Sequence, residues 1–216
     1  MKSCFAMRLP AMTIATAACV ALAGPARSER ADEPKPVEVR GSVAFAVDTN
    51  VPAVTVHGKS NVLTAHLRVR TAPDGTVLEG IEAALPVKSL ETGMGLRDEH
   101  MRKYVFTAGD GRLPDLQFKS DKAVCAKGAP RQPSTCQLSG TLAIRGTARP
   151  FTIVLKLTED GDTLRAVGDG TIALSAYGIE RPSQLGVRTE DAVKLRFDMT
   201  GKVSDARAVG TTGKVR

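Results

Sequence analysis

The chain has 216 residues, enough for one domain with short extensions, and its 42% hydrophobic content is ordinary for a globular protein. Aromatic residues make up only 4% and tryptophan is absent, so we expect an aliphatic core. The net charge of +7 does not indicate nucleic-acid binding, because no basic stripe with exposed aromatics is visible. Most of that charge lies near the ends, with +2 in residues 1–26 and +3 in residues 201–216.

The first segment, residues 1–26, predicts an export signal. Two basic residues precede an apolar, alanine-rich run from Leu9 to Ala23, and small residues typical of a cleavage site follow it. We expect cleavage after Ala23 or Ala26, which places the mature chain in the periplasm or otherwise outside the cytoplasm. The run is too short and too rich in alanine to span a bilayer well. An uncleaved anchor, or a lipid attached at Cys19 in "TAAC", stays open as an alternative.

Residues 27–38 are charged and contain prolines, a composition that predicts a flexible linker. Further along, Cys125 and Cys136 are separated by ten residues. In an exported chain such a pair is most simply a disulfide. A zinc site would need two more ligands, and the intervening segment contains no His, Asp or Glu. We predict a structural disulfide that stabilises the fold by about 3 kcal/mol on the entropic model.

From residue 39 onward, apolar and polar residues alternate with a period of two, which is typical of β-strands with one buried face. In "NVLTAHLRVR", Leu63, Ala65, Leu67 and Val69 alternate with polar residues. The same pattern recurs in five further segments: "TVLEGIEAALPV", "QLSGTLAIRG", "FTIVLKLT", "GTIALSAYG" and "AVKLRFDMT". Turn-forming sequences separate them: "PDG" at 73–75, "RGTARP" at 145–150 and "EDGD" at 159–162.

These features predict an all-β domain over residues 39–201, followed by a basic flexible tail at 202–216. Because each strand has one apolar face, closing the sheet into an antiparallel β-barrel of about eight strands buries that face and removes the sheet edges. The interior of such a barrel is just wide enough for side chains or one slim ligand. A β-sandwich is the alternative. The alternation fails near residues 95–104, where we expect one short helix or loop.

The segment "SLETGMGLRDEHM", Ser89 to Met101, contains the most functional groups. Its residues Arg97, Asp98, Glu99 and His100 could together provide an acid, a base and a metal ligand. However, the sequence has no histidine pair at metal-binding spacing, no Gly-x-Ser-x-Gly elbow and no P-loop. An acid in the first turn of a helix also has a structural use, because it interacts favourably with the helix dipole. We therefore predict no catalytic residue and no metal, although a functional role for "RDEH" stays open on the residues alone.

Five motifs occur in order: "SLETGMGLRDEHM", "YVF", "LPDLQFKS", "LSGTLAIRGTARPFTI" and "SAYGI". Together they resemble the pattern of the YceI-like family of exported bacterial proteins, over roughly Val39 to Gly201. The resemblance implies a lipocalin-like barrel that binds a long amphiphile, such as a polyisoprenoid or isoprenoid quinone, in an apolar tunnel. It implies no enzyme activity and no cofactor other than such a lipid. It also implies that the segment 89–101 is a loop and helix beside the barrel, not an active site.

The inward-facing apolar residues are therefore the candidate contacts for a long-chain lipid. An isoprenoid chain offers no hydrogen bonds, so its affinity would come from apolar contact, about 0.8 kcal/mol per buried CH₂. The predicted ligand-binding residues are Leu67, Val69, Ile81, Leu85, Phe118, Leu142, Ile144, Phe151, Ile153, Leu155, Ile172, Leu174, Leu195 and Phe197.

Alternation does not distinguish a tunnel from a packed core. The alternative function is thus a ligand-free structural or interaction barrel of the cell envelope, with its basic tail in peripheral contact with anionic lipid headgroups. The sequence does not choose between a monomer and a homodimer, and it predicts no nucleic-acid partner.

Overall fold

The computed structural model describes residues 34–72, 75–126 and 133–203. The predicted export signal with both cleavage sites, most of the predicted linker and nearly all of the predicted tail lie outside the described residues. Those assignments therefore stay predictions from sequence.

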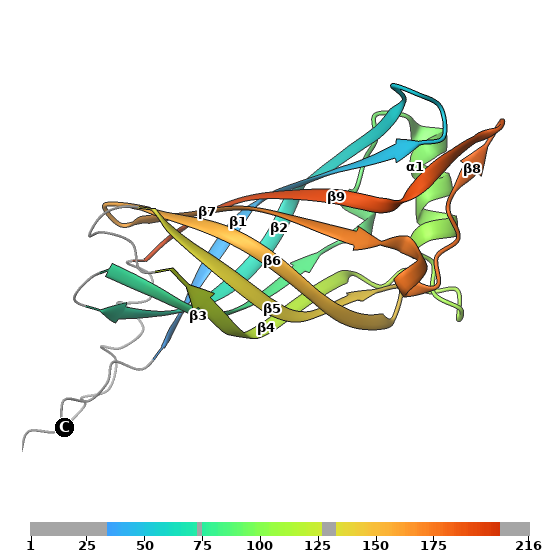
Figure 1. The fold of residues 1–216 in the computed structure, drawn as a ribbon. Coiled ribbons are helices and arrows are strands. Elements are labelled where there is room, and N and C mark those ends of the chain that lie inside the picture. The colour runs from blue at the N-terminus through green and yellow to red at the C-terminus, as the bar shows by residue number, and fades with distance from the viewer. Residues whose placement is uncertain (1–33, 73–74, 127–132, 204–216) are drawn as a thin grey trace, which may run out of the picture. The chain divides into compact units, whose positions relative to one another are not determined.

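Eight long strands form a closed antiparallel barrel (Figure 1). Each strand pairs with the next along the chain, and β9 pairs with both β7 and β1, which closes the sheet. The barrel strands are β1 (Lys35–Thr49), β2 (Thr55–Ala72), β3 (Gly75–Leu85), β4 (Leu116–Cys125), β5 (Ser134–Ile144), β6 (Thr147–Asp160), β7 (Thr163–Ala173) and β9 (Val187–Lys202). The two-residue strand β8 (Ser183–Gln184) forms a short hairpin with the start of β9. The predicted all-β barrel is confirmed, and the sandwich is excluded.

Helical structure occupies the connection between β3 and β4. A 3₁₀ turn, η1 (Val87–Ser89), precedes α1 (Gly95–Met101), which continues directly into a π-helical turn, η2 (Arg102–Phe106). The single short helix predicted near residues 95–104 is therefore confirmed. A second 3₁₀ turn, η3 (Leu174–Tyr177), follows β7. None of the helices in the described part of the chain is long and apolar enough to cross a bilayer.

The barrel extends beyond its predicted boundaries at both ends. β1 begins at Lys35, inside the predicted linker 27–38, and β9 reaches Lys202, the first residue of the predicted tail. Val37 and Val39 are fully buried and alternate with exposed residues, so the strand pattern was already present. The prolines and charges around them obscured it, although a proline is tolerated near the start of a strand.

Because of a β-bulge, the first residues of β3 have a different orientation from the one that alternation predicts. Alternation in "TVLEGIEAALPV" predicts Val77 on the inward face with Ile81, but the register between β2 and β3 shifts at Arg68 and Val69. Leu78 is buried instead, and Val77 is only partly covered. An extra residue on one strand reverses the side-chain alternation beyond it, and a strict period of two has no way to show this.

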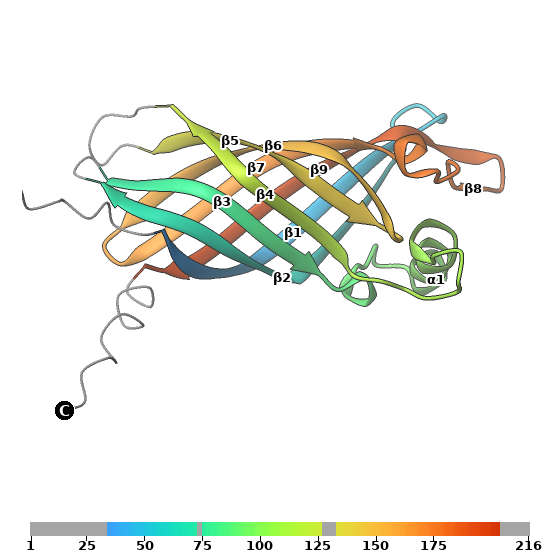
Figure 2. The ribbon, with the colours of Figure 1, turned by 90° about the horizontal axis from the view of Figure 1, so that it is seen from below.

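The two ends of the barrel carry different structures (Figure 2). At one end, here called the helix end, lie α1 and β8, together with the connections that leave β1, β3, β5 and β7. At the other, the disulfide end, β1 begins and β9 finishes. There Cys125 at the end of β4 is bonded to Cys136 near the start of β5, with 3.9 Å between their Cα atoms. The predicted disulfide is confirmed.

Candidate functional site

The interior of the barrel has two parts with different packing. Toward the disulfide end, large inward side chains are fully buried and fill the space; we call this the packed half. It includes Val37, Val39, Ala65, Leu67, Leu78, Leu138, Leu155 and Leu164. Toward the helix end lies a cavity of about 1060 Å³, here called the hollow half. That volume is slightly above the range of about 300–1,000 Å³ that is usual for ligand pockets.

Single strands pass from one half to the other. On β6, Phe151 and Ile153 line the cavity, whereas the next inward residues, Leu155 and Leu157, belong to the core. The floor of the cavity therefore lies near Ile153. Ile153 is the sixth residue after Thr147, where β6 starts at the helix end. At about 3.3 Å per residue and a strand tilt of about 40°, the cavity is roughly 15 Å deep within the barrel.

Several inward apolar side chains in the hollow half keep part of their surface accessible. Phe45, Ile172, Leu195 and Phe197 are only partly buried, although they pack against the core and line the cavity. Side chains in a filled interior interdigitate with few voids larger than a water molecule. The accessible surface of these four residues therefore faces the cavity and is free to contact a ligand.

Two glycines make room for aromatic rings in the cavity wall. A Cβ at Gly58 would lie 2.2 Å from the ring of Phe45, and one at Gly170 would lie 2.7 Å from the ring of Phe151. Both distances are too short for real atoms, so a larger residue at either position would force the ring to move. Phe151 also packs edge-to-face against Phe118, with 5.7 Å between ring centroids. The rings are thus held against the wall by their neighbours.

Eleven of the fourteen predicted ligand-binding residues line this cavity: Ile81, Leu85, Phe118, Leu142, Ile144, Phe151, Ile153, Ile172, Leu174, Leu195 and Phe197. The other three, Leu67, Val69 and Leu155, face inward but lie in the packed half, outside the cavity lining. The sequence did not show this, because alternation gives the direction of a side chain and not its depth along the barrel. Contact of the eleven with a ligand stays a prediction.

Sequence reasoning missed a second group of lining residues. Val43, Phe45 and Val47 of β1 line the cavity, and their alternation in "SVAFAVD" would have identified them. Met101 and Val105 from the helical connection line it as well. No periodicity in the sequence places a helix over the opening of a barrel, so these two had no usable signal.

The "RDEH" segment holds the start of α1 against the preceding loop. The Asp98 carboxylate is buried and accepts hydrogen bonds from the Thr92 backbone N–H (2.7 Å) and the Thr92 hydroxyl (2.5 Å). Arg97 donates to Oγ1 and to the backbone oxygen of Thr92, at 2.8 and 2.9 Å. Thr92 is thereby bound from two consecutive helix residues. This arrangement accounts for the arginine and the aspartate as structural groups.

The same loop is also fixed to β2. Lys59 and Glu91 exchange two backbone hydrogen bonds of 2.9 and 3.0 Å, and the hydroxyls of Ser60 and Ser89 lie 2.7 Å apart. Ser60 is almost fully buried. The segment from Ser89 to Asp98 therefore clamps the helix beside the opening of the barrel. No group of three or more His, Cys, Asp or Glu side chains suited to a metal ion occurs within residues 34–72, 75–126 and 133–203.

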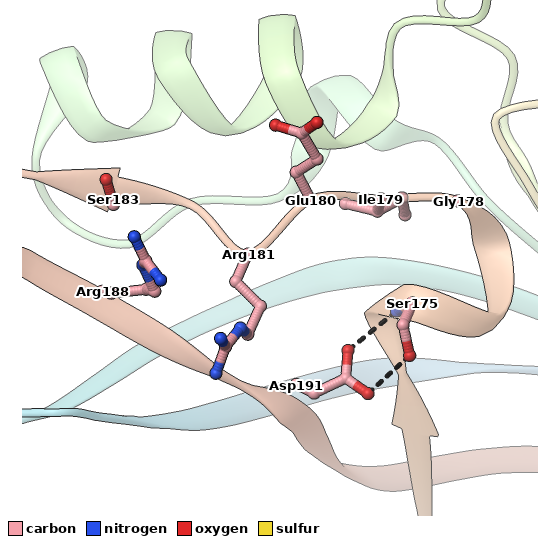
Figure 3. A pocket seen from close by; sticks show the side chains of 8 residues that line it. All are labelled: Ser175, Gly178, Ile179, Glu180, Arg181, Ser183, Arg188 and Asp191. Atoms are coloured by element: carbon pink, nitrogen blue, oxygen red, sulfur yellow. Dashed lines mark hydrogen bonds between the residues drawn. The ribbon is translucent and has the colours of Figure 1, made fainter.

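A smaller polar pocket of about 790 Å³ adjoins the cavity (Figure 3). The segment from Gly178 to Arg181 contributes to the walls of both. On the β9 side, Asp191 accepts hydrogen bonds from the backbone N–H (2.8 Å) and the hydroxyl (2.6 Å) of Ser175, as the dashed lines show. These bonds, helped by the nearby Arg181 guanidinium, hold the pKa of Asp191 below its usual value. The opening is thus partly polar, whereas the interior is apolar.

The comparison with protein families identifies this barrel. A model of the YceI-like domain matches residues 37–201, most of the chain and nearly all of the described residues. The chain belongs to the YceI-like family. The family resemblance carried by the five sequence motifs is confirmed. No significant match was found among curated proteins.

Solved structures share the YceI-like fold. BcnA from Burkholderia cenocepacia is 19% identical with a TM-score of 0.57, covering 74% of this chain and 95% of its own. A polyisoprenoid-binding domain from Saccharophagus degradans is 15% identical with a TM-score of 0.57, covering 79% and 99%. The YceI protein of Campylobacter jejuni is 16% identical with a TM-score of 0.56, covering 71% and 88%. At these identities the similarity shows the fold and not the ligand.

Proposed function

We propose that this YceI-like protein is an exported carrier or reservoir for one long-chain amphiphile, such as a polyisoprenoid or an isoprenoid quinone. The apolar chain would occupy the hollow half, and the polar head would lie at the helix end. The observation that carries the proposal is the cavity of about 1060 Å³, lined almost entirely by aliphatic and aromatic side chains inside the barrel. The polyisoprenoid-binding domain of similar fold supports this choice of ligand class.

The chemistry of the lining fits such a ligand. A hydrocarbon chain gains about 0.8 kcal/mol for each CH₂ that leaves water, and it requires no polar partner along its length. Most polar residues of the lining, including Thr92, Arg97, Glu180 and Arg181, come from the loops and helix at the opening. An amphiphile with its head at the opening would satisfy both environments. A packed half below the cavity would set the length of chain that fits.

We further propose that the protein is not an enzyme and needs no cofactor. Asp98, the acid with the strongest claim to a catalytic role, already accepts two hydrogen bonds from Thr92. His100 packs edge-on against Tyr104, with 5.6 Å between ring centroids. Replacement of either Asp98 or His100 by alanine is expected to loosen the helix and weaken ligand retention. A turnover that disappears in His100→Ala would contradict this assignment.

Organic extraction of the purified protein followed by mass spectrometry tests the central proposal. We expect one dominant lipid with a long isoprenoid chain, and rebinding of that class by the delipidated protein. Val193 lines the cavity, whereas Val154 points outward from β6. Val193→Phe should therefore reduce rebinding and Val154→Phe should not. A wild-type protein that yields no lipid and rebinds none would favour the ligand-free structural barrel instead.

The exported state requires its own test, because residues 1–33 lie outside the described part of the chain. N-terminal sequencing of the purified protein should identify a start after Ala23 or Ala26. Retention of Met1 on a cytoplasmic species would contradict export while leaving the binding proposal intact.

A further inference from the structure

We infer that the helix end of the barrel docks on the surface of a phospholipid bilayer, with Leu185 inserted among the lipid chains. The inference rests on the proposed function and extends it, because it names the place where cargo would enter and leave the cavity. It starts from the short hairpin of β8 and β9, which lies at the same end of the barrel as α1 (Figures 1 and 2).

Leu185 occupies a position that folding alone does not explain. Gln184 pairs with Val187, so Leu185 and Gly186 form a two-residue hairpin turn, and both have positive φ, at 50° and 81°. Such turns favour Asn-Gly or Asp-Gly, because a branched side chain is strained at positive φ. The Leu185 side chain is 97% exposed and packs against nothing in its own fold. A strained, fully exposed leucine at a turn tip has a clear use only if it contacts an external apolar partner.

The hairpin holds this leucine in a fixed position. The Asn50 side chain donates to the backbone oxygen of Gly186 (3.2 Å) and accepts from the backbone N–H of Arg188 (2.7 Å). The Asn50 backbone N–H also donates to the Arg188 oxygen, at 2.9 Å. One residue of the β1–β2 connection thus braces both sides of the turn. The exposure of Leu185 is therefore a property of an ordered element.

Other exposed apolar residues surround the same opening. Met94 and Tyr104 are each 58% exposed, Val54 is 43% exposed, and all three line the cavity together with Leu185. Met94 and Tyr104 belong to the β3–β4 connection, Val54 to the β1–β2 connection, and Leu185 to the segment between β7 and β9. Leu96, on α1, is exposed as well. The apolar lining of the cavity therefore continues outward onto the rim of the opening.

Two cations accompany these apolar tips. Lys103 lies over the ring of Tyr104, with its Nζ 5.2 Å from the ring centroid, and Arg188 follows the Leu185 turn. Neither side chain forms an ion pair with another residue that the structure describes. A long basic side chain beside an inserted apolar residue can extend to phosphate headgroups while its stem stays in apolar surroundings.

This geometry fits a bilayer better than a protein partner. A stable protein interface needs a continuous, complementary patch of about 800 Å² on each partner. Here the apolar side chains project from separate connections around a hollow opening, which prevents close packing against a rigid surface. A fluid bilayer can accept each tip separately. A cargo that dissolves only in lipid could then pass between the bilayer and the cavity without entering water.

Fluorescence can test the contact directly, because the chain contains no tryptophan. Leu185→Trp introduces a single reporter at the turn, and Val154→Trp introduces a matched reporter on the outer face of β6, where the side chain is 47% exposed. Each purified variant is mixed with phosphatidylcholine vesicles that contain brominated acyl chains, with and without phosphatidylglycerol. We expect a blue shift and quenching for Leu185→Trp only, strengthened by the anionic lipid. Absence of both changes for Leu185→Trp would overturn the inference.

Leu185→Asn separates docking from folding, because asparagine suits the turn better than leucine. This variant should be at least as thermally stable as the wild type, yet bind vesicles about tenfold more weakly, since it loses one inserted leucine. Val154→Thr should leave vesicle binding unchanged. Equal vesicle binding by Leu185→Asn and wild type would contradict docking through Leu185. A Leu185→Trp signal that follows protein concentration and not lipid would assign the turn to self-association, and it would contradict docking as well. Loss of the cavity ligand with intact docking would instead count against the proposed function alone.

Discussion

The packed half and the hollow half of this barrel are built from the same strands, yet one excludes solvent and the other encloses space. In the packed half, small inward residues face large ones: a Cβ at Gly168 would lie 2.4 Å from a methyl group of Leu155, and Ala166 pairs in register with Leu157. In the hollow half, Phe45 and Phe151 fit against glycines of the wall and leave the centre free. Glycines therefore have opposite effects in the two halves: they let large side chains fill the interior of the packed half, and they leave the centre of the hollow half open.

The two halves should also contribute to different properties, the packed half to stability and the hollow half to ligand binding. The packed half has no accessible surface to offer a ligand, so its contribution is to hold the barrel closed. The hollow half leaves apolar surface accessible, which is unfavourable in water until a ligand covers it. Substitutions in the two halves should consequently affect different measurements.

The largest expected effect is loss of stability in the packed half. Leu155 is fully buried there, and Leu155→Ala should lower the free energy of unfolding by about 2–5 kcal/mol, because the surroundings do not collapse onto the space left behind. The matched variant Leu195→Ala removes the same atoms from the cavity wall and should cost clearly less. Chemical denaturation of the delipidated proteins measures both. Equal losses would mean that the two halves are packed alike.

Removal of the disulfide should produce the next largest effect, again confined to stability. The bond joins two residues eleven apart at the disulfide end, and Cys136 is fully buried beside Leu155. The double variant Cys125→Ala, Cys136→Ala should lose about 3 kcal/mol. Binding of an isoprenoid to the folded double variant should stay near the wild-type value. A parallel loss of affinity would show that the packed half also shapes the cavity.

The sequence predicted the closed barrel well, because that prediction depends only on alternation and turns. Leu63, Ala65 and Leu67 face inward as expected, and the disulfide is where the cysteine spacing placed it. The predicted orientation was wrong at the bulge between Leu78 and Gly80, where one extra residue reverses the alternation. The sequence did not show that Leu67 and Leu155 lie in the packed half. Whether the interior is filled at a given depth depends on which side chains meet across the barrel, and the order of residues along one strand does not specify this.

The opening of the cavity was the least predictable part. The motif "SLETGMGLRDEHM" was located correctly as a loop and helix beside the barrel, by family resemblance. Its specific contacts, such as Asp98 with Thr92, join residues six apart in an irregular segment and follow no period. Leu185 carried no sequence signal, since a single leucine in a polar stretch acquires meaning only when its φ angle and exposure are known.

A pair of substitutions two residues apart sharpens the boundary between the halves. Ile153 lines the cavity and Leu155 lies below it on the same strand. Leu155→Phe adds volume to a filled region and should cost about 1–3 kcal/mol of stability. Ile153→Phe has free space beside it, so the delipidated protein should melt close to wild type while isoprenoid binding falls. Melting curves and binding isotherms of both variants check this, and strong destabilisation by Ile153→Phe would move the cavity floor toward the helix end.

The smallest expected effect concerns acid and the hollow half. Asp191 has a lowered pKa because its carboxylate accepts hydrogen bonds from Ser175, which belongs to η3 at the helix end. A carboxyl group with a lowered pKa in the folded state stabilises it above the unfolded value of 3.8, and this contribution is lost as pH falls below that value. Asp191→Asn should therefore melt slightly below wild type at pH 7, with the gap narrowing below about pH 4. Isoprenoid retention should show the same pH-dependent gap, because η3 includes the lining residue Leu174. The matched variant Asp169→Asn, on the outer face of β7, should show no such gap in retention. A similar loss of retention in both variants would show that the hydrogen bonds between Asp191 and Ser175 have no specific effect on the cavity.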